Sequence, residues 1–236
     1  MAESLLEQQA NSEDTSLNAG RLVLDVIQSR RSIREGFTSK PIPNKVISEI
    51  IKSGLAAPSS KNAQPWKLHV VHRGELLNSI ADDVQNAKDA KRYVPINPAT
   101  GKSLQWPSTV AESSRVLREV GVGLFIENIG AFSGGRQNVA SAVEDVRRNA
   151  ITGYCLEVIG LGAIMVQNMW LSANAQGLNG VFMGDIGVAE PEIQARLGMQ
   201  GDLIGVVALG YSEHETFDKQ LRPDTVVFHT SSEEEA

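Results

Sequence analysis

The spacing of apolar and polar residues predicts a helix, a polar loop and a strand early in the chain. Apolar side chains recur at helical spacing over Pro43–Ala57, and Pro58 follows directly. Residues 67–72 have the composition of a strand, and residues 74–91 return to an amphipathic helical spacing. The polar loop over residues 58–66 is therefore expected to join two ordered elements.

The second half of the chain predicts one long helix and then alternating short elements. A helical pattern runs over Val139–Ala175, first charged and then almost wholly apolar, and Gly177 and Gly180 are expected to end it. The remaining expected elements are a strand over Val181–Met183, a short helix from Pro191, a strand over Leu203–Leu209 and one further strand over Val226–His229.

The middle of the chain has a less regular pattern. Tyr93–Pro107 contains three prolines and is expected to be irregular, as a flexible cover would be. Apolar residues between positions 120 and 126 indicate a strand, although several glycines interrupt the surrounding Thr109–Gly135 stretch. Another helix is expected over Leu22–Gln28, immediately before a cluster of cations.

Strands separated by helices predict an α/β or α+β protein with one sheet covered by helices. Val158–Gly184 contains no charged residue over 27 positions, but glutamines and asparagines interrupt it, so a helix buried between protein layers is favoured over a membrane span. Such a helix needs a second chain to cover it, which predicts an obligate symmetric dimer. The alternative is a monomer built around one central helix.

Composition excludes several classes of protein. The 236 residues carry a formal charge of −6, which argues against a surface that binds nucleic acid. The one cysteine, Cys155, excludes an internal disulfide and a multi-thiolate metal site. The N-terminal residues lack the pattern of a signal peptide, so a cytoplasmic location without membrane contact is expected. Residues 1–20 and 231–236 are expected to be acidic tails.

Familiar catalytic and nucleotide-binding motifs are absent from the sequence. There is no Gly-x-Ser-x-Gly elbow, no complete dinucleotide-binding glycine fingerprint and no phosphate-binding P-loop. His69 and His72 fall on opposite faces of a predicted strand and therefore do not form a metal pair. No metal site is expected.

Two polar segments remain as candidates for binding chemistry. Arg30, Arg31 and Arg34, with the Ser32 hydroxyl between them, have the charges and donors to hold a phosphate, although each cluster alone is typical of a solvated helix end. Hydroxyls and carboxamides in the 58–66 loop both donate and accept hydrogen bonds, which suits the edge of a planar heterocycle or a sugar-alcohol chain.

Together these segments resemble the nitroreductase family of flavin enzymes. The resemblance covers residues 22–80 and 150–228. It rests on Ser-Arg-Arg-Ser-Ile-Arg at 29–34, Ala-Pro-Ser-Ser-Lys-Asn-Ala-Gln-Pro-Trp at 57–66, the region 177–187 and Gly-Asp-Leu-Ile-Gly-Val-Val-Ala-Leu-Gly-Tyr at 201–211. It implies an α+β, three-layer fold in which helices flank a central, mostly antiparallel sheet. It also implies a single FMN-binding domain over residues 21–230, with a variable lid around residues 92–138, and an obligate homodimer with two FMN molecules at its interface.

The resemblance also implies a set of cofactor contacts. The FMN phosphate and pyrimidine edge would be contacted by Arg30, Arg31, Ser32 and Arg34. The flavin of the partner chain would be reached by Pro58, Ser59, Ser60 and Asn62. The backbone beside the reactive N5 atom would come from Met183, Gly184 and Asp185, where some members carry a Glu-Gly pair. A C-terminal cation at the phosphate would be Arg222, or Lys219.

The activity that the resemblance implies is an FMN-dependent oxidoreductase with no protein nucleophile. NADPH or NADH would deliver hydride to the flavin, and a nitroaromatic or quinone acceptor would then occupy the same face, giving ping-pong kinetics. A guanidinium such as that of Arg34 would stabilise the reduced, anionic flavin. The alternatives are another reaction on the same fold, such as reductive dehalogenation or ring dehydrogenation, and a flavin-binding protein without turnover.

Overall fold

The protein is built around a four-stranded antiparallel sheet. The computed structural model describes residues 18–88, 90, 102, 108–131, 133–140, 154, 155 and 157–215. Its strands are β1 (Trp66–His72), β2 (Val122–Asn128), β3 (Asn179–Met183) and β4 (Asp202–Gly210), in the spatial order β1-β2-β4-β3. Every neighbouring pair is antiparallel. All seven residues of β2 are buried, which makes this strand the centre of the core.

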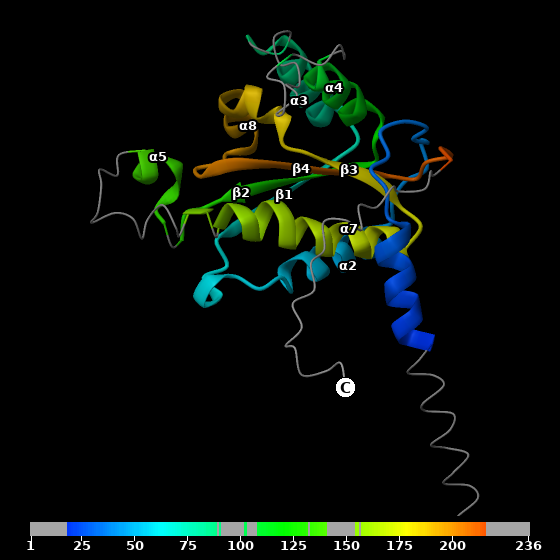
Figure 1. Ribbon diagram of the computed structural model, residues 1–236. Helices are drawn as coiled ribbons and strands as arrows, with labels where there is room; N and C mark the ends of the chain where they lie inside the picture. The colour runs from blue at the N-terminus through cyan, green and yellow to red at the C-terminus, as the bar shows by residue number, and fades with distance from the viewer. Residues whose placement is uncertain are drawn as a thin grey trace, which may run out of the picture.

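Helices cover both faces of the sheet, which confirms the expected α+β, three-layer architecture (Figure 1). One layer contains α3 (Glu75–Asn86), α4 (Thr109–Glu119) and α8 (Glu190–Leu197), and the other contains α2 (Asn44–Leu55) and α7 (Val166–Ala175). The apolar faces of these helices supply fully buried side chains such as Leu77, Val116 and Met169. Burial of these faces against the sheet is what stabilises the helices.

Most of the expected elements are present, with shifted ends. The helix expected over Leu22–Gln28 spans residues 18–29, so it includes three positions that were assigned to the acidic tail. The helix expected over residues 74–91 is the shorter α3. The long helix expected up to Ala175 contains a π-helical stretch, Gly160–Met165, before α7, and residues 141–153 of that expected helix lie outside the described residues.

Gly180 does not end the preceding helix, as the sequence pattern suggested, but lies within β3. A Cβ atom at this position would lie 2.1 Å from the Ala208 carbonyl oxygen of the neighbouring strand. The residue is therefore glycine because two backbones approach closely here, and not because a helix stops.

Much of the range expected to be a variable lid, residues 92–138, forms regular secondary structure. Residues 109–119 form α4 and residues 122–128 form the central strand β2, both with buried side chains. The glycines that made this stretch look irregular lie in tight packing: a Cβ at Gly123 would lie 2.9 Å from the Phe125 ring. Residues 135–140 form α5 (Gly135–Ala140), while most of the proline-containing Tyr93–Pro107 stretch lies outside the described residues.

Two further short elements complete the described chain, the 3-10 helices Ser60–Asn62 and Asp185–Ala189. The strand expected over Val226–His229, residues 1–17 of the expected N-terminal tail and the whole expected C-terminal tail fall outside the described residues. None of the described helices combines the length and apolar character needed to cross a membrane.

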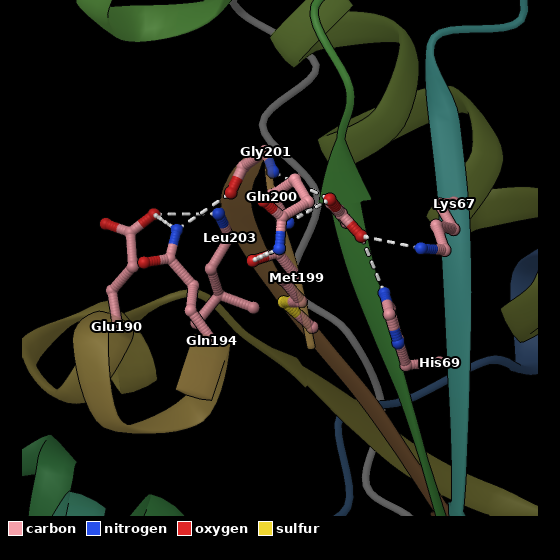
Figure 2. Close-up of polar contacts among 9 residues, drawn as sticks. Lys67, His69, Glu190, Gln194, Met199, Gln200, Gly201 and Leu203 are labelled. Carbon is pink, nitrogen blue, oxygen red and sulfur yellow. Dashed lines mark hydrogen bonds and ion pairs between the residues drawn. The ribbon is translucent and has the colours of Figure 1, made fainter. Parts of the chain in front are cut away.

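A buried carboxylate ties the end of the central strand to the turn before β4. Glu127 is 1% exposed, and its Oε1 atom accepts hydrogen bonds from the backbone N–H groups of Gln200 (2.8 Å) and Gly201 (2.6 Å). Its Oε2 atom accepts from His69 Nε2 at 2.7 Å and lies 3.9 Å from Lys67 Nζ, as Figure 2 shows for the labelled partners. Burial by itself raises the pKa of Glu127, but these hydrogen bonds together hold it below the ordinary value for glutamate.

Replacing this carboxylate should destabilise the fold. We expect Glu127→Gln to lower the free energy of unfolding by about 2–3 kcal/mol at pH 7, because an amide cannot accept from all three donors and leaves buried N–H groups unpaired. Urea unfolding followed by circular dichroism measures the change. The exposed Glu49→Gln on α2 is the matched control, with an expected change within about 0.5 kcal/mol.

The difference in unfolding free energy between wild type and Glu127→Gln should depend on pH. Because the pKa of folded Glu127 is lowered, its stabilising contribution is complete above the unfolded value of about 4.3 and is lost as the pH falls through the folded value. The stability difference between wild type and Glu127→Gln should therefore narrow below about pH 4.3. A difference that stays constant down to pH 3 would contradict this account.

Candidate cofactor site

The arginine-rich segment is held in place as an extension of the sheet edge. After the helix over residues 18–29, Ser32 forms a bridge with Gly180 at the start of β3, and Ile33 N–H donates to the Gly180 carbonyl at 3.0 Å. The Ile33 side chain is 1% exposed and anchors the segment in the core. These contacts fix residues 30–34 beside β3. Because side chains alternate in direction along an extended segment, Ile33 points into the core and its polar neighbours can make other contacts.

The environment of Arg30 suits a side chain that binds an anion. Its guanidinium lies 4.2 Å from the centre of the Trp170 ring, and its buried Nε atom has no hydrogen-bond acceptor within the described part of the chain. Burial, and then the neighbouring charge of Arg31, lower the pKa of Arg30. A buried donor without a partner and two adjacent cations both favour binding of an anionic group, so this residue fits the phosphate of the implied FMN.

Arg31 is used differently from Arg30. Its Nη1 atom donates to the backbone carbonyls of Gln28 (2.5 Å) and Arg30 (2.9 Å), at the end of the first helix. A cation in this position stabilises the carbonyls that a helix leaves unpaired at its C-terminus. Among the residues expected at the phosphate, the contacts of Arg31 thus point first to a role in local structure.

Neighbouring residues of helix α4 contact both Arg34 and Asp185. Arg34 Nε lies 3.1 Å from Glu112 Oε2, and the next residue of the helix, Ser113, donates its hydroxyl to Asp185 Oδ1 at 2.8 Å. Arg115 Nη2, one turn further along, donates to the Arg34 carbonyl at 3.1 Å. Because Glu112 and Ser113 are consecutive, the Arg34 side chain and the segment after β3 are held as neighbours.

Gly184 leaves the backbone after β3 open to approach. It follows the buried Met183 and precedes the 3-10 helix Asp185–Ala189. Its φ of −93° is available to any residue, and a Cβ would make only ordinary contacts, the nearest at 3.7 Å to the Ile204 carbonyl oxygen. Packing among the described residues does not require glycine here, and the missing side chain leaves the backbone accessible to an approaching group.

The polar loop over Pro58–Asn62 has an unusual backbone. Lys61, Asn62 and Gln64 adopt positive φ angles of 52°, 54° and 45°, a region that residues other than glycine rarely occupy. Gln64 N–H donates to Ser59 Oγ at 3.0 Å and Gln64 Nε2 to Asn62 Oδ1 at 3.3 Å, which fixes the loop internally. Strained loops of this kind are common at ligand sites.

Within one chain, this loop does not meet the arginine segment. Ser59 and Ser60 line a small pocket together with Trp66, Glu157, Gly160 and Leu161, at the π-helical end of the long helix. The segment over residues 30–34 lies at the opposite end of the molecule, beside β3 (Figure 1). The two halves of the expected site are therefore separate in the single chain.

Two parts of this arrangement were missed by the sequence analysis. The contacts of α4 with Arg34 and Asp185 join residues about 80 positions apart, and nothing in the local pattern signals them. Glu157, which borders the loop pocket, is buried and accepts from Ser133 Oγ (2.5 Å) and Asn128 Nδ2 (3.2 Å). Its position among apolar residues of the expected helix was a signal, because a carboxylate there needs buried partners. Lys219 and Arg222 lie outside the described residues.

An apolar groove that the described residues leave open adjoins the first helix. It is lined by residues of that helix, of α2 and of α7, including Leu22, Val23, Ile27, Leu171 and Ala175. Leu22, Val23 and Ile27 are 65%, 59% and 45% exposed. Large apolar side chains gathered in this way on one face are typical of a surface that a partner covers.

These features define a class of protein: a three-layer α+β fold with an arginine segment on its sheet edge that is suited to a phosphorylated cofactor. Residues 27–211 match the model of the nitroreductase family, and the chain belongs to that family.

Individual relatives match shorter segments. A 46-residue stretch is 50% identical to the 4-nitrobenzoate reductase of Pseudomonas putida and covers 20% of either chain. A 69-residue stretch is 36% identical to the iodotyrosine deiodinase of Drosophila melanogaster and covers 29% of this chain and 24% of that protein. The chain thus spans only about a fifth to a quarter of the length of these two curated relatives.

Solved structures share the fold over most of the chain. The NADPH:FMN oxidoreductase from Vibrio harveyi complexed with NAD+ aligns with a TM-score of 0.63 and 23% identity, over 91% of this chain and 79% of that one. A nitroreductase with bound FMN from Desulfitobacterium hafniense aligns with a TM-score of 0.64 and 18% identity, over 89% and 98% of the two chains. At these identities the likeness establishes the fold.

The close approach at Gly180 offers a test of how the arginine segment is positioned. We expect Gly180→Ala to destabilise the protein by about 1–3 kcal/mol, because the new methyl group collides with a backbone carbonyl that cannot rotate away. Since Ser32 and Ile33 pair with Gly180, FMN retention should fall as well. Thermal unfolding and the flavin content of the purified protein are the measurements.

Gly187→Ala is the matched control for this substitution. Gly187 lies in the nearby 3-10 helix, and a Cβ there would meet nothing within 4 Å. Both stability and flavin content should remain at the wild-type level. If Gly180→Ala behaves like Gly187→Ala, the contact between the segment and β3 does not position the site.

Proposed function

We propose that the protein is an FMN-dependent oxidoreductase that uses NADPH or NADH to reduce nitroaromatic or quinone-type acceptors. The observation that carries this proposal is the buried Arg30 Nε, which has no acceptor among the residues that the structure describes. It lies on a sheet-edge segment of a chain that belongs to the nitroreductase family. When bound, FMN would supply the redox chemistry, which is hydride uptake at N5 and transfer of electrons to the acceptor.

The residues of the chain would hold and orient the cofactor. Arg30 and Ser32 would bind the phosphate, Arg34 would place a positive charge at the pyrimidine edge, and the open backbone at Gly184 would lie beside N5. Ser113 would keep the segment after β3 in position through Asp185. No side chain is assigned as a nucleophile. The nicotinamide and the acceptor would use one face of the site in turn, which predicts ping-pong kinetics.

We also propose that the working form is a homodimer. The loop over Pro58–Asn62 and the arginine segment lie apart in one chain. A second copy of the chain is therefore needed, so that the loop of one chain reaches the cofactor held by the arginine segment of its partner. The exposed apolar groove beside the first helix supplies a surface for that contact. A dimer would bury these side chains and complete the site in the same step.

The reaction can be tested directly on the purified protein. We expect a yellow protein with flavin absorption, bleached by anaerobic addition of NADPH or NADH and reoxidised by 4-nitrobenzoate or a benzoquinone, and sedimenting as a dimer. A colourless protein that does not take up added FMN would contradict the proposal. A flavoprotein that neither nucleotide reduces would instead be a flavin-binding protein without turnover.

Reductive dehalogenation on the same fold is the second candidate. It is favoured by the similarity of short segments to iodotyrosine deiodinases, at 36% identity over 69 residues for the Drosophila protein. The cofactor contacts would be the same for both reactions, so only a test of which acceptor the protein reduces distinguishes them. Release of iodide from iodotyrosine by the reduced protein, without turnover of nitrobenzoate, would select this second candidate.

The role of Arg30 gives a sharper prediction. Arg30→Ala should weaken FMN binding by about 1.5–3 kcal/mol, or about 10- to 150-fold in Kd, because a charge-assisted bond to phosphate is lost. Arg30→Lys keeps the charge and should fall between wild type and the alanine variant. Arg118→Ala, which removes an exposed arginine of α4 paired with Asp82, is the control and should bind FMN normally. Fluorescence titration of the flavin-free protein measures all four affinities.

A further inference from the structure

The charge of Arg34 is opposed by a carboxylate on a neighbouring element. Arg34 Nε lies 3.1 Å from Glu112 Oε2, and both side chains are 43% exposed. Arg34 is the residue expected at the pyrimidine edge of the flavin, where negative charge collects on reduction. Any group that offsets the guanidinium charge there changes how strongly the reduced form is stabilised.

The position of Glu112 is fixed by the packing of α4. Val110, Val116 and Leu117 of this helix are fully buried, and the Ser114 hydroxyl donates to the Ala81 carbonyl of α3 at 2.8 Å. Glu112 is therefore carried on an anchored helix and not on a mobile loop.

The same helix also contacts both segments that border the expected flavin ring. Besides the Glu112 pair, Ser113 donates to Asp185, and Arg115 donates to the Arg34 carbonyl. Glu112 thus belongs to a set of contacts that fixes the distance between a carboxylate and the Arg34 guanidinium. A pair held in this way has a defined effect on a nearby charge, unlike two freely rotating surface side chains.

We propose that Glu112 is a positioning residue that partly neutralises Arg34 and so keeps the redox potential of the bound flavin lower than Arg34 alone would set it. This inference rests on the proposed function, because it requires FMN in the site. Its consequence is chemical: a lower potential makes the reduced protein a stronger reductant toward electron-poor acceptors and a weaker oxidant of the nicotinamide.

The experiment compares Glu112→Gln with wild type as purified flavoproteins. Removing the carboxylate charge leaves Arg34 unopposed, so the potential should rise and the affinity for sulfite should increase, since sulfite adds at N5 and leaves negative charge at N1 and C2=O. For an ion pair this exposed, the expected change is about fivefold in sulfite affinity, equivalent to about 20 mV for a two-electron couple. The shift should shrink in 1 M salt, because screening weakens exposed charges.

Asp82→Asn is the matched control. Asp82 is also paired with an arginine of α4, through Arg118 Nη2 at 2.6 Å, but it lies on α3 and six helical positions separate Arg118 from Glu112. The same loss of one carboxylate charge should leave potential and sulfite affinity at the wild-type values. Glu112→Asp, which keeps the charge, should restore most of the wild-type potential.

The outcomes separate this inference from the proposed function. A wild-type protein that takes up no FMN overturns the function and the inference together. A wild-type flavoprotein in which Glu112→Gln and Asp82→Asn have the same potential and sulfite affinity overturns the inference alone. Loss of FMN from Glu112→Gln would also overturn it, because Glu112 would then serve to hold the cofactor and not to set its potential.

Discussion

The pairing of a short extended segment with the edge of β3 is the contact on which the site depends. One backbone hydrogen bond from Ile33 to Gly180, together with complete burial of the Ile33 side chain, places Arg30 and Arg34 on opposite sides of an anchored residue. Position 180 must be glycine because the backbone of β3 approaches the Ala208 carbonyl of β4 so closely that a side chain would not fit between them. Two cationic side chains are thus positioned by a strand of the sheet, and not by a loop of their own.

The rest of the sheet supports this edge from the far side. β2 is buried along its whole length and pairs with both β1 and β4, and Glu127 at its end ties the turn before β4 through two backbone N–H groups. Since β4 pairs directly with β3, a fixed start of β4 also fixes the strand that carries Gly180 and leads to Gly184. Core packing and site geometry are therefore parts of one continuous structure.

The sequence predicted the elements whose pattern is local and missed those that depend on distant neighbours. Periodic apolar residues were sufficient to predict α2, α3 and β4, and the two polar motifs led to the family that the comparison confirms. A strand was expected between positions 120 and 126, but its central place was obscured because Gly121 and Gly123 look like breaks. They instead make room for Ile42 and for the Phe125 ring, respectively. Gly180 was misassigned for the same reason: a glycine that permits close packing cannot be told from one that ends a helix without knowing what lies opposite.

Arg30 Nε is buried without an acceptor among the described residues, and this has a consequence for the protein that has no anion bound. Burial of a donor without an acceptor is unfavourable, so the fold is less stable before an anion arrives than after. An anion bound at this position would accept a hydrogen bond from the buried Arg30 donor, and it would do so only in the folded state. Its binding would therefore stabilise the folded protein. Resistance to heat and to proteases should then increase with the concentration of that anion in the surrounding medium. The lifetime of the polypeptide would depend on how much of it carries the anion.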